Sequence, residues 1–147
     1  MPNDLVRKLI TRHEGANEEI DQHQLALCEI TIFELSAKGA KYVSQGRLPQ
    51  ERVARGIEAI VHDDSVVKTS AYEGQTLTMA IKLRSMVKDF IDCLIIASAA
   101  RHCDVLTTED DEIHSLSGNR RFEEVTMRGR SSKPLEIRRL REIKGFI

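Results

Sequence analysis

The sequence predicts an α/β protein built around a mostly parallel sheet. Short apolar runs alternate along the chain with longer stretches in which apolar residues recur at helical spacing. Strands that alternate with helices in this way are joined by helical crossovers and therefore run parallel. The length of 147 residues suits a single domain. No stretch approaches the roughly 20 apolar residues that a membrane-spanning helix needs.

The first half of the chain supplies most of this alternation. Helical spacing and flanking glycines predict three helices here, over Leu5–His13, over Ile30–Val43 and from Pro49 to Val61. Leu25–Cys28 is a brief apolar run that predicts a buried strand, and Val66-Val67 predicts a second one. An amphipathic helix is expected over Tyr72–Val87.

The second half contains the most apolar helix and then a basic end. Asp89–His102 predicts a buried helix, Asp104–Thr107 a third strand, and Glu123–Met127 a fourth. The Ser-Ser-Lys-Pro sequence at 131–134 marks a break. We therefore expect a domain over residues 1–130 and a basic C-terminal extension over 131–147, in the form of a helix or an arm.

Charge is distributed unevenly, although the net charge is only −1. Residues 89–117 carry seven acids and one base, and residues 118–147 carry nine Lys and Arg against four Glu. An acidic centre followed by a basic end fits a metal site beside a surface for phosphate groups, and it equally fits two solvated stretches that differ in sign.

The cysteines and histidines show no pattern that indicates a metal site or a catalytic nucleophile. Cys28, Cys93 and Cys103 form no Cys-x-x-Cys pair and are expected as buried thiols of a reducing cytoplasm. The five histidines show no zinc-like spacing with cysteines. No nucleophile elbow, Walker loop or dinucleotide glycine pattern is present. These patterns leave the carboxylates as the candidate functional groups.

Three acids stand where ligands of open α/β sheets gather, beyond the carboxyl ends of strands. Glu34 interrupts an apolar run, Asp92 lies at the start of the buried helix, and Asp110 follows the third strand. Converging carboxylates are what a hard divalent cation needs. Each acid also has a structural alternative, because Glu34 can pair with Lys38 four residues on, and the two Asp residues can stabilise helix N-termini.

Three blocks of sequence resemble the PIN-domain family of metal-dependent ribonucleases. The first is Ile-Thr-Ile-Phe-Glu-Leu at 30–35, the second Asp-Cys-Leu-Ile-Ile-Ala-Ser-Ala at 92–99, and the third Leu-Thr-Thr-Glu-Asp at 106–110. The resemblance implies a three-layer α/β/α PIN-like domain. It also implies that Glu34, Asp92 and Asp110 bind Mg²⁺ or Mn²⁺, and that Thr108 positions Asp110 or a water molecule.

The N-terminus departs from the family pattern. Family members begin with a central strand that ends in an Asp, followed by Thr or Ser and then Asn or Ser. The sequence has no such strand before Asn3-Asp4-Leu5. The resemblance therefore implies that the first strand and first acid are missing from this chain, through truncation or a misplaced start, or that Asp4 takes the place of that acid.

The resemblance implies a metal-dependent endoribonuclease, with RNA as substrate. Arg120, Arg121, Arg128 and Arg130 are candidate contacts to RNA phosphates, or else solvated loop charges. Small single-domain members resemble the toxins of toxin–antitoxin pairs, so an antitoxin protein and a second copy of the chain are candidate partners. Two alternatives remain open: a catalytically impaired PIN-like module that binds RNA or protein, and a structural protein that dimerises.

Overall fold

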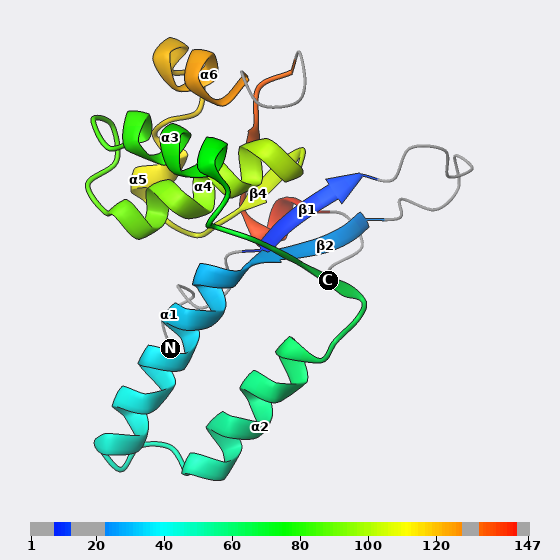
Figure 1. Cartoon of the computed structure of the whole chain (residues 1–147), viewed down its shortest axis with the longest axis vertical. Coiled ribbons are helices and arrows are strands. Elements are labelled where there is room, and N and C mark those ends of the chain that lie inside the picture. Colours follow the sequence, from blue (N-terminus) through cyan, green and yellow to red (C-terminus); the bar gives the residue numbers. More distant parts are fainter. Residues whose placement is uncertain (1–7, 13–22, 128–132, 144–147) are drawn as a thin grey trace.

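A five-stranded sheet forms the middle of the molecule in the computed structural model, which describes residues 8–12, 23–127 and 133–143 (Figure 1). The strand order is β3-β2-β1-β4-β5. The strands are β1 (Lys8–Arg12), β2 (His23–Cys28), β3 (Val66–Thr69), β4 (Val105–Thr107) and β5 (Glu136–Arg138). The helices are α1 (Glu29–Ser44), α2 (Gln50–Val61), α3 (Gly74–Leu83), α4 (Phe90–His102), α5 (Asp111–His114), α6 (Arg120–Met127) and the 3₁₀ turn η2 (Leu140–Glu142).

Four of the five strands run in one direction. β2 pairs in parallel with β3, and β4 pairs in parallel with β5. The central strand β1 is antiparallel to both of its neighbours, β2 and β4, so these two run the same way as each other. The predicted α/β class with a mostly parallel sheet is confirmed, and β1 is the exception to the common direction.

Helix α4 lies at the centre of the core. Its residues from Asp92 to Ala100 are all buried. The helix packs against α3 and α6 as well as against β2 and β4 (Figure 1). A helix that is apolar on every side is stable only when it is enclosed in this way. Each fully buried Leu or Ile side chain contributes roughly 1.5–3 kcal/mol relative to exposure. The prediction of a most-buried helix over Asp89–His102 is confirmed.

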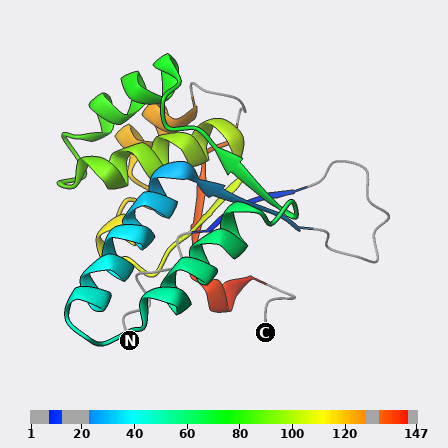
Figure 2. The ribbon, with the colours of Figure 1, turned by 60° about the horizontal axis from the view of Figure 1, so that its bottom comes forward.

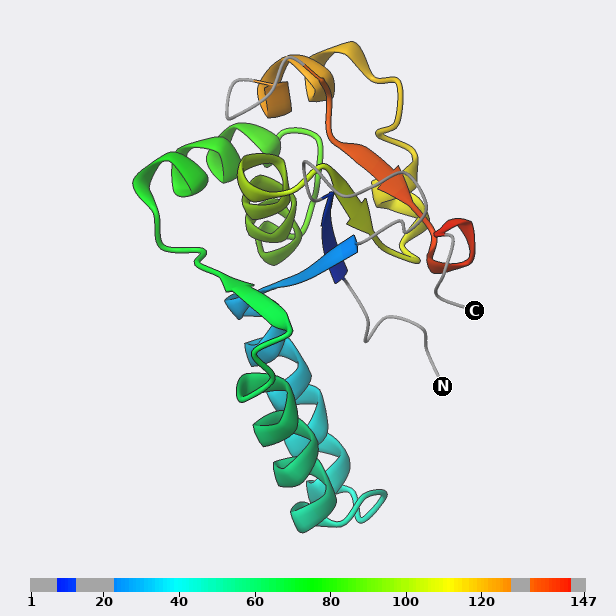
Figure 3. The same cartoon turned by 90° about the vertical axis from the view of Figure 1, so that its right-hand side faces the viewer.

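Helices α1 and α2 form an arm that projects away from the rest of the molecule (Figures 1 and 3). The two helices lie side by side (Figure 2), and Gly39 of α1 lies against Val53 of α2. A Cβ atom on Gly39 would lie 2.5 Å from the Val53 Cγ1 atom, so no larger residue fits without movement. Every residue of α2 is exposed or only half-buried. The arm is therefore packed much less deeply than α4.

Two predictions of secondary structure were wrong: one expected helix is a strand, and one expected strand is a helix. Lys8–Arg12, expected in a helix, forms strand β1, and it fills the gap between the inner edges of β2 and β4; the rest of that expected helix lies outside the described residues. The segment expected as a strand at Glu123–Met127 is part of α6 instead. Phe122 and Thr126, four residues apart, are both buried, which is helical spacing. The Asn119 side chain accepts a hydrogen bond from the Phe122 amide and so caps the start of α6. Both features favour a helix over a strand in this segment.

The basic end of the chain contributes to the sheet. Strand β5 lies within residues 131–147, the region expected as an extension, and it pairs with β4 from Val105 to Thr107. A hydrogen bond from the Thr108 amide to the Arg138 carbonyl oxygen, 3.0 Å long, continues the pairing past the end of β4. Among the residues that the structure describes, no helix combines the length and apolar character needed to cross a membrane.

Candidate active site

Two of the candidate acids, Glu34 and Asp110, come after strands that end at the same edge of the sheet. Since β2, β3 and β4 share a direction, their carboxyl ends lie together, which is the edge where ligands of α/β proteins bind. The register aligns Lys8 of β1 with Thr107, and Leu9 with Ala26 of β2. The ends of β2 and β4 are therefore level to within one residue and separated by one strand, which is about 10 Å at the usual strand spacing.

Asp92 lies in the first turn of α4 and is only 6% exposed. The N-terminal cap of this helix is a different residue, Asp89, whose carboxylate accepts a hydrogen bond of 2.8 Å from the Ile91 amide. Asp92 is therefore not required as the cap. An ionised carboxylate in an apolar environment is costly unless donors or cations compensate it. The helix N-terminus supplies part of that compensation, and a bound cation would supply more.

Asp110 is the N-terminal cap of α5. One of its oxygens accepts hydrogen bonds from the amides of Glu112 at 2.8 Å and Ile113 at 3.3 Å. The hydroxyl oxygen of Thr108 accepts a hydrogen bond of 3.2 Å from the Asp110 amide. Thr108 is itself buried, and its carbonyl oxygen lies 2.7 Å from His114 Nε2. These contacts fix the direction in which the chain leaves β4 and hold Asp110 at its end.

Arg139 anchors the same loop from the other side. Its guanidinium donates to the Glu109 carbonyl oxygen at 3.3 Å, lies 3.5 Å from a Glu109 carboxylate oxygen, and pairs with Asp111. The Leu140 amide donates to Glu109 Oε1 at 2.9 Å. The hydrogen bond and charge of Arg139 lower the pKa of Asp111, and the same contact raises the pKa of Arg139. The acids on both sides of Asp110 are thus held by the segment that follows β5.

Glu34 occupies the second turn of α1, at the base of the arm, and is half-buried. Helix α1 begins directly after Cys28, the last residue of β2, so Glu34 lies beyond the same sheet edge as Asp110. Its four-residue spacing from Lys38 still permits the ion pair considered from the sequence. Of the three candidate acids, Glu34 is in the least deeply packed helix.

A buried polar cluster ties this edge to α4. The hydroxyl oxygens of Thr69, at the end of β3, and Ser98, in α4, are 2.7 Å apart, and Cys28 forms side-chain hydrogen bonds to both residues. Burial raises the pKa of the Cys28 thiol despite these bonds. A neutral, fully buried thiol is not a nucleophile. The cluster instead positions the strand ends against α4.

A metal site is not closed by the described residues alone. No three His, Cys, Asp or Glu side chains in residues 8–12, 23–127 and 133–143 lie close enough together to hold an ion. The donor chemistry nevertheless suits Mg²⁺, because all three candidates offer carboxylate oxygens. This ion usually keeps several water ligands and binds through one or two carboxylates together with substrate phosphates. Asp92 and Asp110 fit that arrangement by donor type.

Of the four arginines expected to contact RNA, the structure describes Arg120 and Arg121. Arg120 and Arg121 are exposed on α6, and Arg120 forms an ion pair of 3.3 Å with Glu124, one turn along the helix. An exposed pair of this kind contributes little to stability. Arg128 and Arg130 lie outside the described residues.

Sequence reasoning missed the residues that hold the site from a distance. Arg139 is separated from Asp111 by 28 positions, and Thr69 from Ser98 by 29. Only the excess of basic residues after residue 118 hinted that the C-terminal segment faces acids. The pairing of β5 with β4, which brings Arg139 to the loop, had no apolar signature beyond Ile137 and Leu135.

Comparison with family models matches the model described as "PIN domain" to residues 6–119. The match covers most of the chain and includes Glu34, Asp92, Thr108 and Asp110. Comparisons with curated proteins and with solved structures return no match.

Proposed function

Because the chain belongs to the PIN-domain family, whose members are generally nucleases, we propose that it is a Mg²⁺- or Mn²⁺-dependent endoribonuclease. The observation that carries the proposal is the buried carboxylate of Asp92, in the first turn of the most buried helix and within the matched region. Asp110, held by its cap contacts, and Glu34, at the base of α1, are the other proposed ligands.

In the proposed site, some residues bind the metal ion and others fix the positions of its ligands. Asp92 is fixed by the burial of α4, so its carboxylate has little freedom to move. Thr108 and Arg139 fix the loop that carries Asp110. A divalent ion bound there would lower the pKa of a water ligand and neutralise charge that develops on the scissile phosphate.

The first test is cleavage of single-stranded RNA by the full chain with Mg²⁺ or Mn²⁺, compared with Asp92→Asn. Even outer-shell partners of a metal are worth about 10- to 100-fold in activity. We therefore expect the variant to lose more than about 100-fold. Asp89→Asn is the matched control, because this carboxylate lies three residues away at the same helix end and Asn is an equally good cap.

Thermal unfolding distinguishes a functional acid from a structural one. Mn²⁺ should raise the Tm of the wild type and leave that of Asp92→Asn unchanged, because only a folded state that binds the ion is stabilised by it. Without metal, Asp92→Asn should unfold at the same temperature as the wild type or higher. Full cleavage by Asp92→Asn would contradict the assignment.

A binding module is the second candidate function, favoured by the finding that no three metal-ligand side chains converge among the described residues. Under this reading the chain retains RNA or a protein without cutting RNA. Retention of RNA that is equal in EDTA and in Mn²⁺, with no cleavage in either, would establish it.

We also propose a protein partner, such as an antitoxin or a second copy of the chain. The supporting feature is a cavity of about 320 Å³ between α1 and α2, lined mainly by apolar side chains such as Leu35, Val53 and Ile57. Exposed apolar surface of this kind commonly marks an interaction site. Light scattering on the purified chain tests self-association. A strictly monomeric chain would exclude the second copy.

A further inference from the structure

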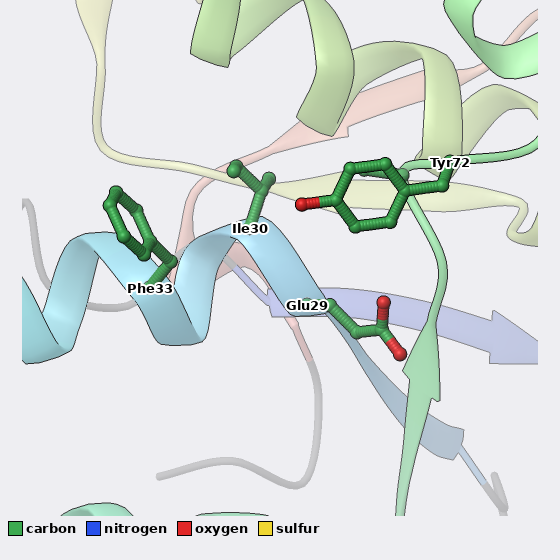
Figure 4. A pocket seen from close by; sticks show the side chains of 5 residues that line it. Glu29, Ile30, Phe33 and Tyr72 are labelled. Carbon is green, nitrogen blue, oxygen red and sulfur yellow. The ribbon is translucent and has the colours of Figure 1, made fainter.

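A second cavity lies at the carboxyl edge of the sheet, and two aromatic side chains from different elements line it. Phe33 comes from α1, Tyr72 from the loop between β3 and α3, and Glu29, Ile30 and Ala71 complete the lining (Figure 4). The chain has only six aromatic residues, four Phe and two Tyr, so two of the six are at this one place. The cavity measures about 170 Å³.

Neither ring contributes much to the core. Phe33 is 63% exposed and Tyr72 is 78% exposed. Single exposed apolar residues are common on protein surfaces. Two large rings on one cavity are different, because each ring offers a flat apolar face to whatever enters. Their exposure leaves ring surface on both residues accessible to a stacking partner.

The loop that carries Tyr72 is firmly held on both sides. Thr69 is bonded to Ser98 in the core, Ala71 is buried, and the Tyr72 amide donates to Ser70 Oγ at 3.1 Å. On the far side, Glu73 pairs with Arg101 and lies 3.2 Å from His102 Nε2, both at the end of α4. The backbone that carries Tyr72 is therefore anchored on both sides, and its ring extends from it into solvent.

The cavity adjoins the candidate active site. Ile30, which lines it, and Glu34, a proposed metal ligand, are four residues apart on α1. Side chains at this spacing are neighbours on a helix surface, with Cβ atoms about 5–6 Å apart. Tyr72 follows β3 and Glu29 follows β2, so both belong to the sheet edge that Asp110 shares.

We propose that this cavity binds an unstacked base of a single-stranded RNA, beside the position of cleavage. The inference rests on the proposed nuclease function and names a subsite of it. Single-stranded RNA is recognised by aromatic side chains that stack on its splayed bases and by polar groups that bond to the base edges. Phe33 and Tyr72 supply the stacking faces.

The size and charge of the cavity agree with a base as occupant. Pockets for drug-sized ligands measure about 300–1,000 Å³, so this smaller cavity suits a ring system and not a whole nucleotide. Glu29 would repel a phosphate, but its carboxylate accepts hydrogen bonds from the amino group of cytosine or adenine. We therefore expect bases with an exocyclic amino group to bind better than uracil, and Glu29→Gln to reduce that difference.

The test measures binding apart from cleavage. A short single-stranded RNA with one 2-aminopurine is titrated with the full chain in EDTA, and quenching of its fluorescence reports stacking. Tyr72→Ala and Phe33→Ala should each weaken binding by about 5- to 150-fold and reduce the quenching, the range that corresponds to roughly 1–3 kcal/mol per stacked base. Tyr72→Phe keeps a ring and should bind like the wild type.

Ile81→Ala is the matched control, because Ile81 is an apolar side chain of α3 with 66% exposure that does not line the cavity. It should leave binding unchanged. Since the Phe33, Tyr72 and Ile81 side chains are neutral, the slope of binding against salt should be the same in these variants as in the wild type. Wild-type binding by both Tyr72→Ala and Phe33→Ala, or an equal loss in Ile81→Ala, would overturn the proposal.

The two proposals fail in different ways. RNA that binds with quenching but is never cut in Mn²⁺ leaves the base subsite in place and removes the nuclease. RNA that is cut by the wild type but bound equally well by both Tyr72→Ala and Phe33→Ala leaves the nuclease and removes the subsite. Absence of any RNA binding by the wild type overturns both.

Discussion

Helix α4 and the arm formed by α1 and α2 show two different ways of holding a candidate ligand. Asp92 sits in a helix whose residues from 92 to 100 are all buried, with α3, α6 and the sheet around it. Glu34 sits in a helix that packs mainly against α2 and touches α4 less extensively, and every residue of α2 is exposed or only half-buried. One acid is fixed by the core, and the other depends on an arm with a large solvent-facing surface.

The difference predicts where the molecule opens first. Segments with few buried apolar contacts open at lower free energy than the core. The arm should therefore exchange its amide hydrogens faster than α4. If a site forms among Asp92, Asp110 and Glu34, the position of α1 is the variable part, and a ligand that needs all three acids would favour one position of the arm.

The largest expected effect comes from the core. Phe122 of α6 is 1% exposed, so Phe122→Ala should lower the free energy of unfolding by about 3–5 kcal/mol. Ile57→Ala in α2 removes a half-buried side chain and should cost about 1 kcal/mol or less. Urea denaturation of both variants measures the comparison directly. Equal losses would mean that the arm is packed in solution against a partner or a second copy.

An intermediate effect is expected where the two arm helices touch. Gly39→Ala places a Cβ atom 2.5 Å from Val53, and overpacking of this kind costs about 1–3 kcal/mol. Val53→Ala in the same chain should recover most of that loss. Gly56→Ala is the control, because no atom lies within 4 Å of its added Cβ and Ala favours a helix by about 1 kcal/mol. Circular dichroism should show a lower Tm for Gly39→Ala and a higher Tm for Gly56→Ala than for the wild type. A Gly39→Ala variant that is more stable than the wild type would mean that α1 and α2 are farther apart.

The smallest effect concerns pH and the loop at Asp110. Arg139 holds the pKa of Asp111 below its usual value, so the pair stabilises the fold above the unfolded pKa, about 4. That contribution is lost as pH falls through the lowered pKa. Arg139→Gln should therefore unfold at lower urea than the wild type at pH 6, and the two should converge toward pH 3. Parallel curves over this whole range would show that the contact does not form in solution.

The sequence predicted those elements whose apolar spacing is unambiguous. Strand β2, helices α1, α2 and α4, and strand β4 were expected close to their observed places. Helix α6 was mistaken for a strand because Val125 and Met127 alternate, whereas burial of Phe122 and Thr126 decides for a helix. Strand β1 depends on pairing with β2 and β4, and β5 on pairing with β4, and such long-range pairing leaves little trace in a short segment.

Some residues of the candidate site could likewise be identified from the sequence, and others could not. Asp92 could be singled out because it stands at the start of a long apolar run, and Asp110 because it caps a helix just after an apolar strand. Arg139 and Tyr72 could not, since the importance of each comes from tertiary contacts or from exposure at a cavity. The role of the three acids as metal ligands stays a prediction.

The three cysteines offer a built-in way to watch these regions separately. Cys28 is at the base of α1, and Cys93 and Cys103 are at the two ends of α4; all three are buried thiols outside any disulfide. Burial raises the pKa of Cys28 and of Cys93, so in the closed protein these thiols are both hidden and protonated. An alkylating reagent can modify them only when the surrounding structure opens. The order in which the three thiols become alkylated would show which region opens first, without any introduced label.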